Sequence, residues 1–174
     1  MTTLVSFLLP GYRLSTGSGL DRALLVKLMQ RTYQELFSGQ DFSHLARTVE
    51  QYFSDSTPLW WVEVAEAASG QVFPHWRQPV ACLWVGNAVE QVQGDRHPHI
   101  FLLYVVPEHR RRGIGKALMC YVEDWAIALG YDQIGLQVFQ SNQPALNLYR
   151  HLGYQTQSLW MVKQLRKDDV SHQK

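Results

Sequence analysis

The chain is predicted to fold as one mixed α/β sheet protein. Its 174 residues are 46% hydrophobic, which is enough for one substantial core. Apolar runs of strand length alternate with segments whose apolar residues recur at helical spacing. The sequence contains no internal repeat and no low-complexity linker. We therefore expect a single domain over residues 1–165, followed by a polar, solvated tail over residues 166–174.

The first half is predicted to hold a strand, two helices and two further strands. Residues 11–17 form the first strand, and Ser18 then caps a helix. Residues 37–39 stop that helix, and Asp41 or Ser43 caps the next one. Strands follow at residues 59–64 and 80–89, on either side of a turn-rich gap at residues 69–79. The apolar positions that define the two helices are Leu20, Leu24, Leu28 and Leu36, then Leu45, Val49, Tyr52 and Phe53.

The second half continues the alternation of strands and helices. A polar connection at residues 90–98 leads to a long apolar strand at residues 99–106, which Pro107 ends. The next helix carries an apolar stripe from Leu118 to Leu129, with Glu123 pointing away from it, and Gly130 stops it. A strand at residues 134–139, a short helix from Pro144 through Leu152 and a terminal pair of strands at residues 154–165 complete the order.

Composition argues against several functional classes. The formal net charge of +1 gives no general attraction to nucleic acid or to an anionic membrane. Cys82 and Cys120 lack the spacing of a disulfide framework or a zinc site, so we expect no metal and two buried, reduced thiols in a cytoplasmic protein. The apolar run at residues 4–9 is too short for a secretory core or a membrane span.

The stretch FLLYVVPEHRRRGIGKAL, residues 101–118, is the strongest functional signal. An apolar strand runs into a turn that contains Gly113 and Gly115 and opens a helix. Glycine lets backbone approach a ligand closely, and the free amides at a helix start favour an anion. The turn therefore indicates a site for a phosphate-bearing cofactor, with a solvated basic turn as the alternative. Positive charge around it comes from Arg110, Arg111, Arg112 and Lys116.

A second signal is SNQPALNLYRHLGY, residues 141–154, where Tyr149 follows Asn142 by seven positions. Together the two stretches resemble the GNAT superfamily of acyl-CoA-dependent N-acetyltransferases. The family's cofactor signature is Arg or Gln, two residues, Gly, one residue, then Gly or Ala, and residues 110–115 match it. The resemblance implies a mostly antiparallel sheet, split at the cofactor site and flanked by helices. It also implies an enzyme that transfers an acetyl group from acetyl-CoA directly to a primary amine in a ternary complex.

The resemblance further implies which residues bind acetyl-CoA. Amides of the turn would hold the pyrophosphate, the strand before it would pair with the pantetheine arm as an extra strand does, and Asn142 would bond that arm. The helix dipole contributes only about 0.3–2 kcal/mol, so charge-assisted bonds and strand pairing must supply most of the affinity. The residues implied in this way are Leu103, Tyr104, Val105, Arg110, Arg111, Arg112, Gly113, Ile114, Gly115, Lys116 and Asn142.

The catalytic residues are less determined than the cofactor residues. By resemblance Tyr149 lies near the thioester sulfur and protonates the departing thiolate, while its alternative role is packing on an apolar stripe. Several relatives carry a glutamate five residues before the asparagine, but this chain has Gln137 there. His99 is the leading candidate for the base because imidazole titrates near neutrality, and Glu63 is the other candidate.

The acceptor, a small molecule or a peptide, stays open, as does the choice between monomer and homodimer. The first two helices and the facing strands are expected to form its pocket, and their aromatic rings suit an apolar or cationic amine. Two other classes remain: a CoA-binding regulatory module without chemistry, suggested by Gln137, and a nucleic-acid binder, opposed by the near-neutral charge. The aromatic residues of the expected pocket are Tyr33, Phe37, Phe42, Trp60, Trp61, Trp76 and Trp84.

Overall fold

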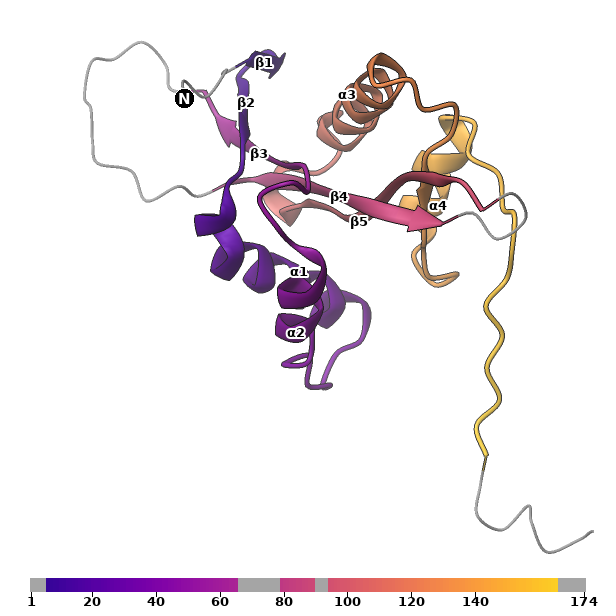
Figure 1. Cartoon of the computed structure of the whole chain (residues 1–174). Helices are drawn as coiled ribbons and strands as arrows, with labels where there is room; N and C mark the ends of the chain where they lie inside the picture. Colours follow the sequence, from indigo (N-terminus) through magenta and orange to yellow (C-terminus); the bar gives the residue numbers. More distant parts are fainter. Residues whose placement is uncertain (1–5, 66–78, 90–93, 166–174) are drawn as a thin grey trace, which may run out of the picture.

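The computed structural model of the chain describes residues 6–65, 79–89 and 94–165. A six-stranded sheet in the order β1-β2-β3-β4-β5-β6 carries helices α1 and α2 on one face and α3 and α4 on the other (Figure 1). The strands are β1 (Ser6–Leu9), β2 (Tyr12–Thr16), β3 (Leu59–Val64), β4 (Ala81–Val89), β5 (Arg96–Val105) and β6 (Gly135–Leu136). The helices are α1 (Arg22–Leu36), α2 (Leu45–Tyr52), α3 (Ile114–Ala128) and α4 (Gln143–His151).

The sheet is antiparallel from β1 to β5, and only β5 and β6 run parallel. Their pairing is limited to His99 with Gly135 and Ile100 with Leu136. Beyond that point β5 continues to Val105 with no strand on this side among the described residues. The predicted mixed α/β fold with a split, mostly antiparallel sheet is therefore confirmed, and the split lies between β5 and β6.

Two apolar layers hold the helices to the sheet. Trp60 and Val62 of β3 face α3, where they pack with a stripe that includes Leu118 and Val122. The alternate residues of β3 face α1 and α2, and Trp61 is fully buried there. Because the central strands are covered on both faces, they read as continuous apolar runs rather than as an alternation.

A β-bulge interrupts β5 just beside the split. Trp84 of β4 pairs with Leu102 and the next residue, Val85, pairs with Ile100, so Phe101 is the extra residue. The Phe101 ring stacks on Trp84 at 4.8 Å and turns toward α1 and α2, whereas Ile100 faces α3. The bulge thus sets which side chains of β5 face each layer.

Two sequence predictions at the N-terminal end are corrected. The strand predicted at residues 11–17 is the second arm of a hairpin, because β1 pairs with β2 across a turn at Gly11, whose φ of +80° favours glycine. Leu20 is 95% exposed rather than on the apolar face of a helix. A 3-10 turn at Gly19–Asp21 precedes α1, so the helical periodicity begins only at Arg22.

The C-terminal strands were predicted too generously. The strand expected at residues 134–139 is reduced to β6, because the chain turns away from β5 after Leu136. The terminal pair of strands at residues 154–165 is wrong, since this segment holds no strand and residues 155–165 are exposed. Residues 155–165 contain no Gly, Pro, Asn or Asp, and a hairpin needs such residues at its turn.

The two cysteines differ in environment. Cys82 is fully buried in β4, as predicted, and burial raises the pKa of its thiol. Cys120 on α3 is exposed, which corrects the expectation of two buried thiols, because it lies off the apolar stripe of the helix.

Trp76, the rest of residues 66–78 and the tail at residues 166–174 lie outside the described residues. Among the helices described, none has both the length and the hydropathy to cross a membrane.

Gly86 supplies a test of the bulge. A Cβ on this residue would lie 2.3 Å from the Phe101 ring, which is held between Trp84 and Tyr52 at centroid distances of 4.8 and 5.4 Å. Gly86→Ala should therefore lower the free energy of unfolding by about 1–3 kcal/mol, as overpacking does, although alanine otherwise suits a strand better than glycine. Urea denaturation measures this change. The exposed neighbour Asn87→Ala should leave stability nearly unchanged, and equal stability of the two variants would show that the ring moves freely.

Candidate active site

The turn between β5 and α3 presents backbone amides to one side of the split. Arg111 has a φ of 62° and Gly113 a φ of +83°, so two residues of this turn adopt the left-handed conformation. Gly113 is the N-cap of α3, and its carbonyl accepts the first helical hydrogen bond, from the Ala117 N–H at 2.9 Å. The N–H groups of Ile114, Gly115 and Lys116 consequently have no partner within the helix. They form a helix start that fits an anionic group.

The basic residues of the turn divide into two kinds. Arg110 donates from Nε to the Val105 carbonyl at 2.8 Å, and Arg112 donates to the Tyr12 hydroxyl at 3.2 Å and to the Glu108 carbonyl at 3.1 Å. These two guanidinium groups shape the turn itself. Arg111 and Lys116 are exposed and make no hydrogen bond or ion pair to another described residue, so their charge is available to a ligand.

Glu35 connects the end of α1 to the turn and was missed by the sequence analysis. Its carboxylate accepts a hydrogen bond from the Tyr104 hydroxyl at 2.6 Å and one from Arg110, and Arg31 lies 3.6 Å away. Burial acts to raise the pKa of Glu35, but the bonds from Arg110 and Tyr104 and the nearby positive charges lower it on balance. Burial and then the Glu35 carboxylate raise the pKa of Tyr104. No sequence pattern links residues so distant along the chain.

The open edge of β5 offers the backbone groups of only some of the predicted residues. The Val106 N–H donates to the Val80 carbonyl at 2.8 Å. Along a strand the backbone groups of alternate residues point to the same side, so every second residue counted back from Val106 directs its N–H and carbonyl toward β4. Tyr104 is two residues before Val106, so its backbone N–H and carbonyl also point toward β4. The backbone groups of Leu103 and Val105 point the other way, toward the split, where the Val105 carbonyl already accepts a hydrogen bond from Arg110. The Leu103 N–H and carbonyl and the Val105 N–H therefore line the open edge.

Helix α4 lies beside the start of α3. A Cβ on Gly115 would lie 3.4 Å from Leu148, which places the two helices in contact there. Asn142 is the N-cap of α4, and its Oδ1 accepts from the Ala145 N–H at 3.3 Å, which leaves its side-chain N–H groups as donors. Tyr149 packs against the α3 layer without a hydrogen bond to a described residue, and burial raises its pKa to about 12.

A buried polar pair adjoins Tyr149. The Tyr154 ring lies 5.8 Å from the Tyr149 ring, and the Tyr154 hydroxyl and Oε1 of Glu123 are both buried beside it. Burial and then the Glu123 carboxylate raise the pKa of Tyr154. Glu123 was predicted to point away from the core, and this orientation is corrected, because its carboxylate is buried beside Tyr154, which follows α4.

The two candidate bases lie at different places on the sheet. His99 is half-buried beside the bulge, with its ring 5.4 Å from Phe101, and burial followed by the charge of His97 lowers its pKa. Glu63 forms an ion pair with Arg13 across β2 and β3 at 2.9 Å. The register places Val62, next to Glu63, level with Val105, roughly 20 Å along β5 from His99 at about 3.3 Å per residue. The two side chains cannot serve one reacting centre.

Only part of the aromatic set predicted for an acceptor pocket gathers near the split. Phe37 and Tyr33 lie 4.9 and 5.8 Å from Phe139, which follows β6, and Tyr33 lies 5.5 Å from Phe42. These four rings, the aromatic wall, extend from α1 to the far side of the split. Trp60 instead packs on the opposite face with Tyr121 and Trp125, while Trp61 and Trp84 are fully buried in the core.

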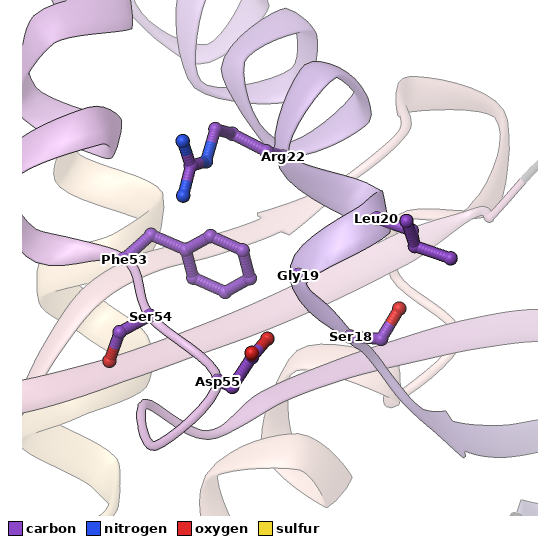
Figure 2. Close-up of a pocket in the computed structure, with 7 residues that line it drawn as sticks. All are labelled: Ser18, Gly19, Leu20, Arg22, Phe53, Ser54 and Asp55. Carbon is purple, nitrogen blue, oxygen red and sulfur yellow. The ribbon is translucent and has the colours of Figure 1, made fainter.

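A separate depression of about 560 Å³ lies where β2 leads into α1 and α2 leads into β3 (Figure 2). It contains none of the predicted site residues, and the guanidinium of Arg22 lies on the side of the Phe53 ring. The split between β5 and β6, with the turn at its end, is therefore the candidate site. The residues that line the depression are Ser18, Gly19, Leu20, Arg22, Phe53, Ser54 and Asp55.

Comparison with known proteins places this geometry in a family. The acetyltransferase (GNAT) family matches residues 24–154. The Escherichia coli peptidyl-lysine N-acetyltransferase YiaC is 44% identical over 52 residues, which are 30% of this chain and 32% of YiaC. The uncharacterized N-acetyltransferase YycN of Bacillus subtilis is 28% identical over 71% of this chain and 91% of its own.

Solved structures support the same fold. A predicted acetyltransferase of Clostridium acetobutylicum, solved with acetyl-CoA, has a TM-score of 0.67 at 16% identity, over 92% of this chain and 99% of that one. The chain spans only about a third of YiaC but most of YycN. The family match covers the turn, the split and α4 together, and the resemblance found in the sequence is confirmed. This chain belongs to the acetyltransferase (GNAT) family, which is a family of acetyl-transferring enzymes.

Proposed function

We propose that this protein transfers the acetyl group of acetyl-CoA to a primary amine by direct transfer in a ternary complex. One observation carries the proposal: the open edge of β5 runs straight into a helix start whose N-cap is the left-handed Gly113. A strand edge and an anion site in line fit a ligand with an extended amide-bearing arm and a pyrophosphate. The family match favours this activity over the alternative of a CoA-binding module without chemistry.

Backbone groups would hold the acyl donor both at the start of α3 and along the open edge of β5. The N–H groups of residues 114–116 would bind the pyrophosphate, with Arg111 and Lys116 adding charge. Leu103 and Val105 would pair with the pantetheine amides along the open edge, and the side-chain N–H of Asn142 would donate to the same arm. When bound, acetyl-CoA supplies an activated thioester as the acyl substrate. Arg110 and Arg112 would act indirectly, by fixing the turn.

Transfer requires the amine nitrogen to lose one proton and the thiolate to gain one. The N–C bond forms as the C–S bond breaks. His99 lies at the bulge where the split closes, and its lowered pKa keeps the imidazole neutral and able to accept a proton at pH 7. Glu63 remains the other candidate. Two observations favour His99 over it: Glu63 is held in an ion pair with Arg13, and it lies near the level of Val105, far from the closed end of the split.

Tyr149 is proposed to act at the leaving sulfur. With a pKa raised to about 12 its phenol stays protonated at neutral pH. A thiol has a pKa of about 8.5, so complete proton transfer from this phenol to the thiolate is uphill by several kcal/mol. A hydrogen bond from Tyr149 that stabilises the developing thiolate is therefore its main contribution, and the proton that the amine releases completes the exchange.

The acceptor is proposed to be an amine with an apolar or aromatic body, either a small molecule or a peptide. The aromatic wall supports this, because such rings bind apolar groups and cations on their faces. YiaC acts on peptidyl-lysine by its name, yet the matched region is short. Acetyl-CoA turnover with an amine and lysine-peptide library tests the proposal, and absence of any acetylated product would favour the silent module.

The first prediction concerns the helix start. Gly113→Glu should abolish acetyl-CoA binding, because it places a negative side chain at the proposed pyrophosphate site and strains a φ of +83°. Gly130→Glu is the matched control: it has a φ of +82° at the other end of α3, so it should lose similar stability and keep binding. Calorimetry measures both. Near wild-type affinity in the Gly113 variant would refute the cofactor site.

The second prediction concerns Tyr149. Tyr149→Phe keeps the ring and deletes the hydroxyl, so turnover should fall by roughly 10- to 10⁴-fold while acetyl-CoA affinity and unfolding temperature change little. Tyr121→Phe on α3, whose ring packs on Trp60, is the control and should retain activity. Steady-state kinetics and calorimetry separate the two effects. Unchanged turnover in Tyr149→Phe would leave this residue a packing role only.

The third prediction concerns the base and the pH profile. Because the pKa of His99 is lowered, activity should fall with acid around a midpoint below 6.5, and His99→Gln should remove that limb without changing acetyl-CoA binding. His97→Gln should keep the limb and move its midpoint upward, since the charge of His97 contributes to the lowering. If Glu63→Gln causes the larger loss, the base is Glu63. If neither variant alters the limb, the enzyme selects the neutral amine without a base.

A further inference from the structure

Glu35 places a negative charge beside the site proposed for an anionic ligand. Its carboxylate accepts hydrogen bonds from the Tyr104 hydroxyl at 2.6 Å and from Arg110, which belongs to the turn that leads to the N-cap of α3. The start of α3 is the proposed pyrophosphate site, and acetyl-CoA carries several negative phosphate charges. On charge alone this carboxylate would therefore oppose binding. Its place in the site requires a second, favourable effect.

The carboxylate of Glu35 sets the direction of the Arg110 side chain. Arg110 donates from Nε to the Val105 carbonyl at 2.8 Å and from Nη2 to Glu35. Its guanidinium carbon also lies 5.6 Å from the centroid of the Tyr104 ring. A guanidinium is a planar fork, so binding a separate acceptor on each side fixes its orientation. Glu35 thus holds the arginine in the position from which it binds the last carbonyl of β5.

The position of Glu35 is itself fixed by contacts of α1. Arg31, one turn earlier on the helix, lies 3.6 Å from the Glu35 carboxylate. On either side of Glu35 in the sequence, Tyr33 and Phe37 pack on the ring of Phe139 at 5.8 and 4.9 Å, and Phe139 follows β6. The end of α1 therefore contacts β5 and its turn through Glu35, and the segment after β6 through these rings. It bridges the split beyond the two positions at which β5 and β6 pair.

The Val105 carbonyl lies at the joint between the two parts of the proposed site. The open edge ends at Val105, and the helix start begins at Gly113. The chain between them contains a 3-10 helix at Pro107–His109 and no strand. The hydrogen bond from Arg110 to the Val105 carbonyl closes this turn. A ligand that binds both the edge and the helix start gains from both only when their separation and direction match its own.

We propose that Glu35 is a positioning residue for acetyl-CoA. Acting through Arg110, it aligns the open edge of β5 with the start of α3, so that one ligand can pair its arm with the edge and place its pyrophosphate on the amides. Arg110 also neutralises the Glu35 charge, which limits repulsion of the ligand. The alignment is then the larger of the two effects. This inference rests on the proposed function, because it assumes that acetyl-CoA binds at these two places.

The sign of one substitution separates alignment from charge. Glu35→Gln keeps the size of the side chain and an oxygen for the Tyr104 hydroxyl, but it removes the charge that holds Arg110. We expect acetyl-CoA affinity to fall by about 5- to 20-fold, between the effect of an exposed ion pair and that of a hydrogen bond to a charged group. Removal of a repulsive charge alone would raise the affinity. Isothermal titration calorimetry measures the change, and an affinity equal to or above that of wild type overturns the proposal.

Glu50→Gln is the matched control, since Glu50 is an exposed glutamate on α2, in the same helical layer. It removes the same charge and should leave acetyl-CoA affinity nearly unchanged. A loss as large as that of Glu35→Gln would overturn the proposal, because the effect would not be specific to Glu35. The Glu35 side chain is 32% exposed, so water can solvate the substituted group and both variants should keep the wild-type circular dichroism.

A double-mutant cycle tests the route through Arg110. In an Arg110→Gln background the guanidinium that Glu35 orients is absent. Adding Glu35→Gln to this background should therefore cause no further loss of acetyl-CoA affinity. Additive losses would mean that Glu35 acts by another route, and they overturn the proposal.

ADP tests the alignment, because it carries a diphosphate group without the extended arm. It needs only the helix start, so Glu35→Gln should leave its affinity, measured by displacement of acetyl-CoA, unchanged or raised. An equal loss for ADP and acetyl-CoA would show that the turn itself is damaged, and it overturns the alignment. The wild-type protein separates the two proposals: failure to bind acetyl-CoA refutes the proposed function, whereas binding that Glu35→Gln does not weaken refutes only the role of Glu35.

Discussion

The short pairing of β5 with β6 is the constraint on which the rest of the site depends. Two ladder positions hold the strands together at His99 and Ile100, and the bulge at Phe101 follows at once. From there no strand among residues 6–65, 79–89 and 94–165 pairs with this edge of β5 up to the turn before α3. A fully paired β6 would satisfy the same backbone groups and leave an extended ligand nothing to bind. The unpaired edge therefore costs sheet stability, and in the proposed function it is the surface that pairs with the pantetheine arm.

Glu35 shows how α1 and the turn before α3 are mechanically joined across this split. It lies at the end of α1, next to the aromatic wall, yet its carboxylate holds Arg110 and Tyr104 of the opposite strand and turn. Arg110 in turn fixes the Val105 carbonyl at the open edge. Movement of α1 when an amine binds would be transmitted through this carboxylate to the turn. The charges are partly exposed, so salt weakens this connection.

The sequence predicted the turn before α3 and α3 itself well, and the contacts between distant segments poorly, for physical reasons. Gly113 must be glycine for local backbone reasons, and α3 follows from its own periodicity and its stop at Gly130, so both were readable. Glu35, Tyr154 and Glu123 act through contacts between distant segments, which periodicity does not record. Residues 134–139 and 154–165 have strand-like composition, but a strand also needs a partner edge. Composition predicts the preference and not the partner.

The choice between the two candidate bases depends on the same topology. Both Glu63 and His99 lie on strands, and their residue types alone do not separate them. The register does, because antiparallel pairing carries Glu63 to the end of the sheet level with Val105, while His99 stays where β5 and β6 still pair. Gly135 brings β6 close beneath the ring, since a Cβ there would lie 3.4 Å from Nδ1 of His99. An imidazole held in this way, half-buried at the closed end of the split, is oriented before any amine arrives.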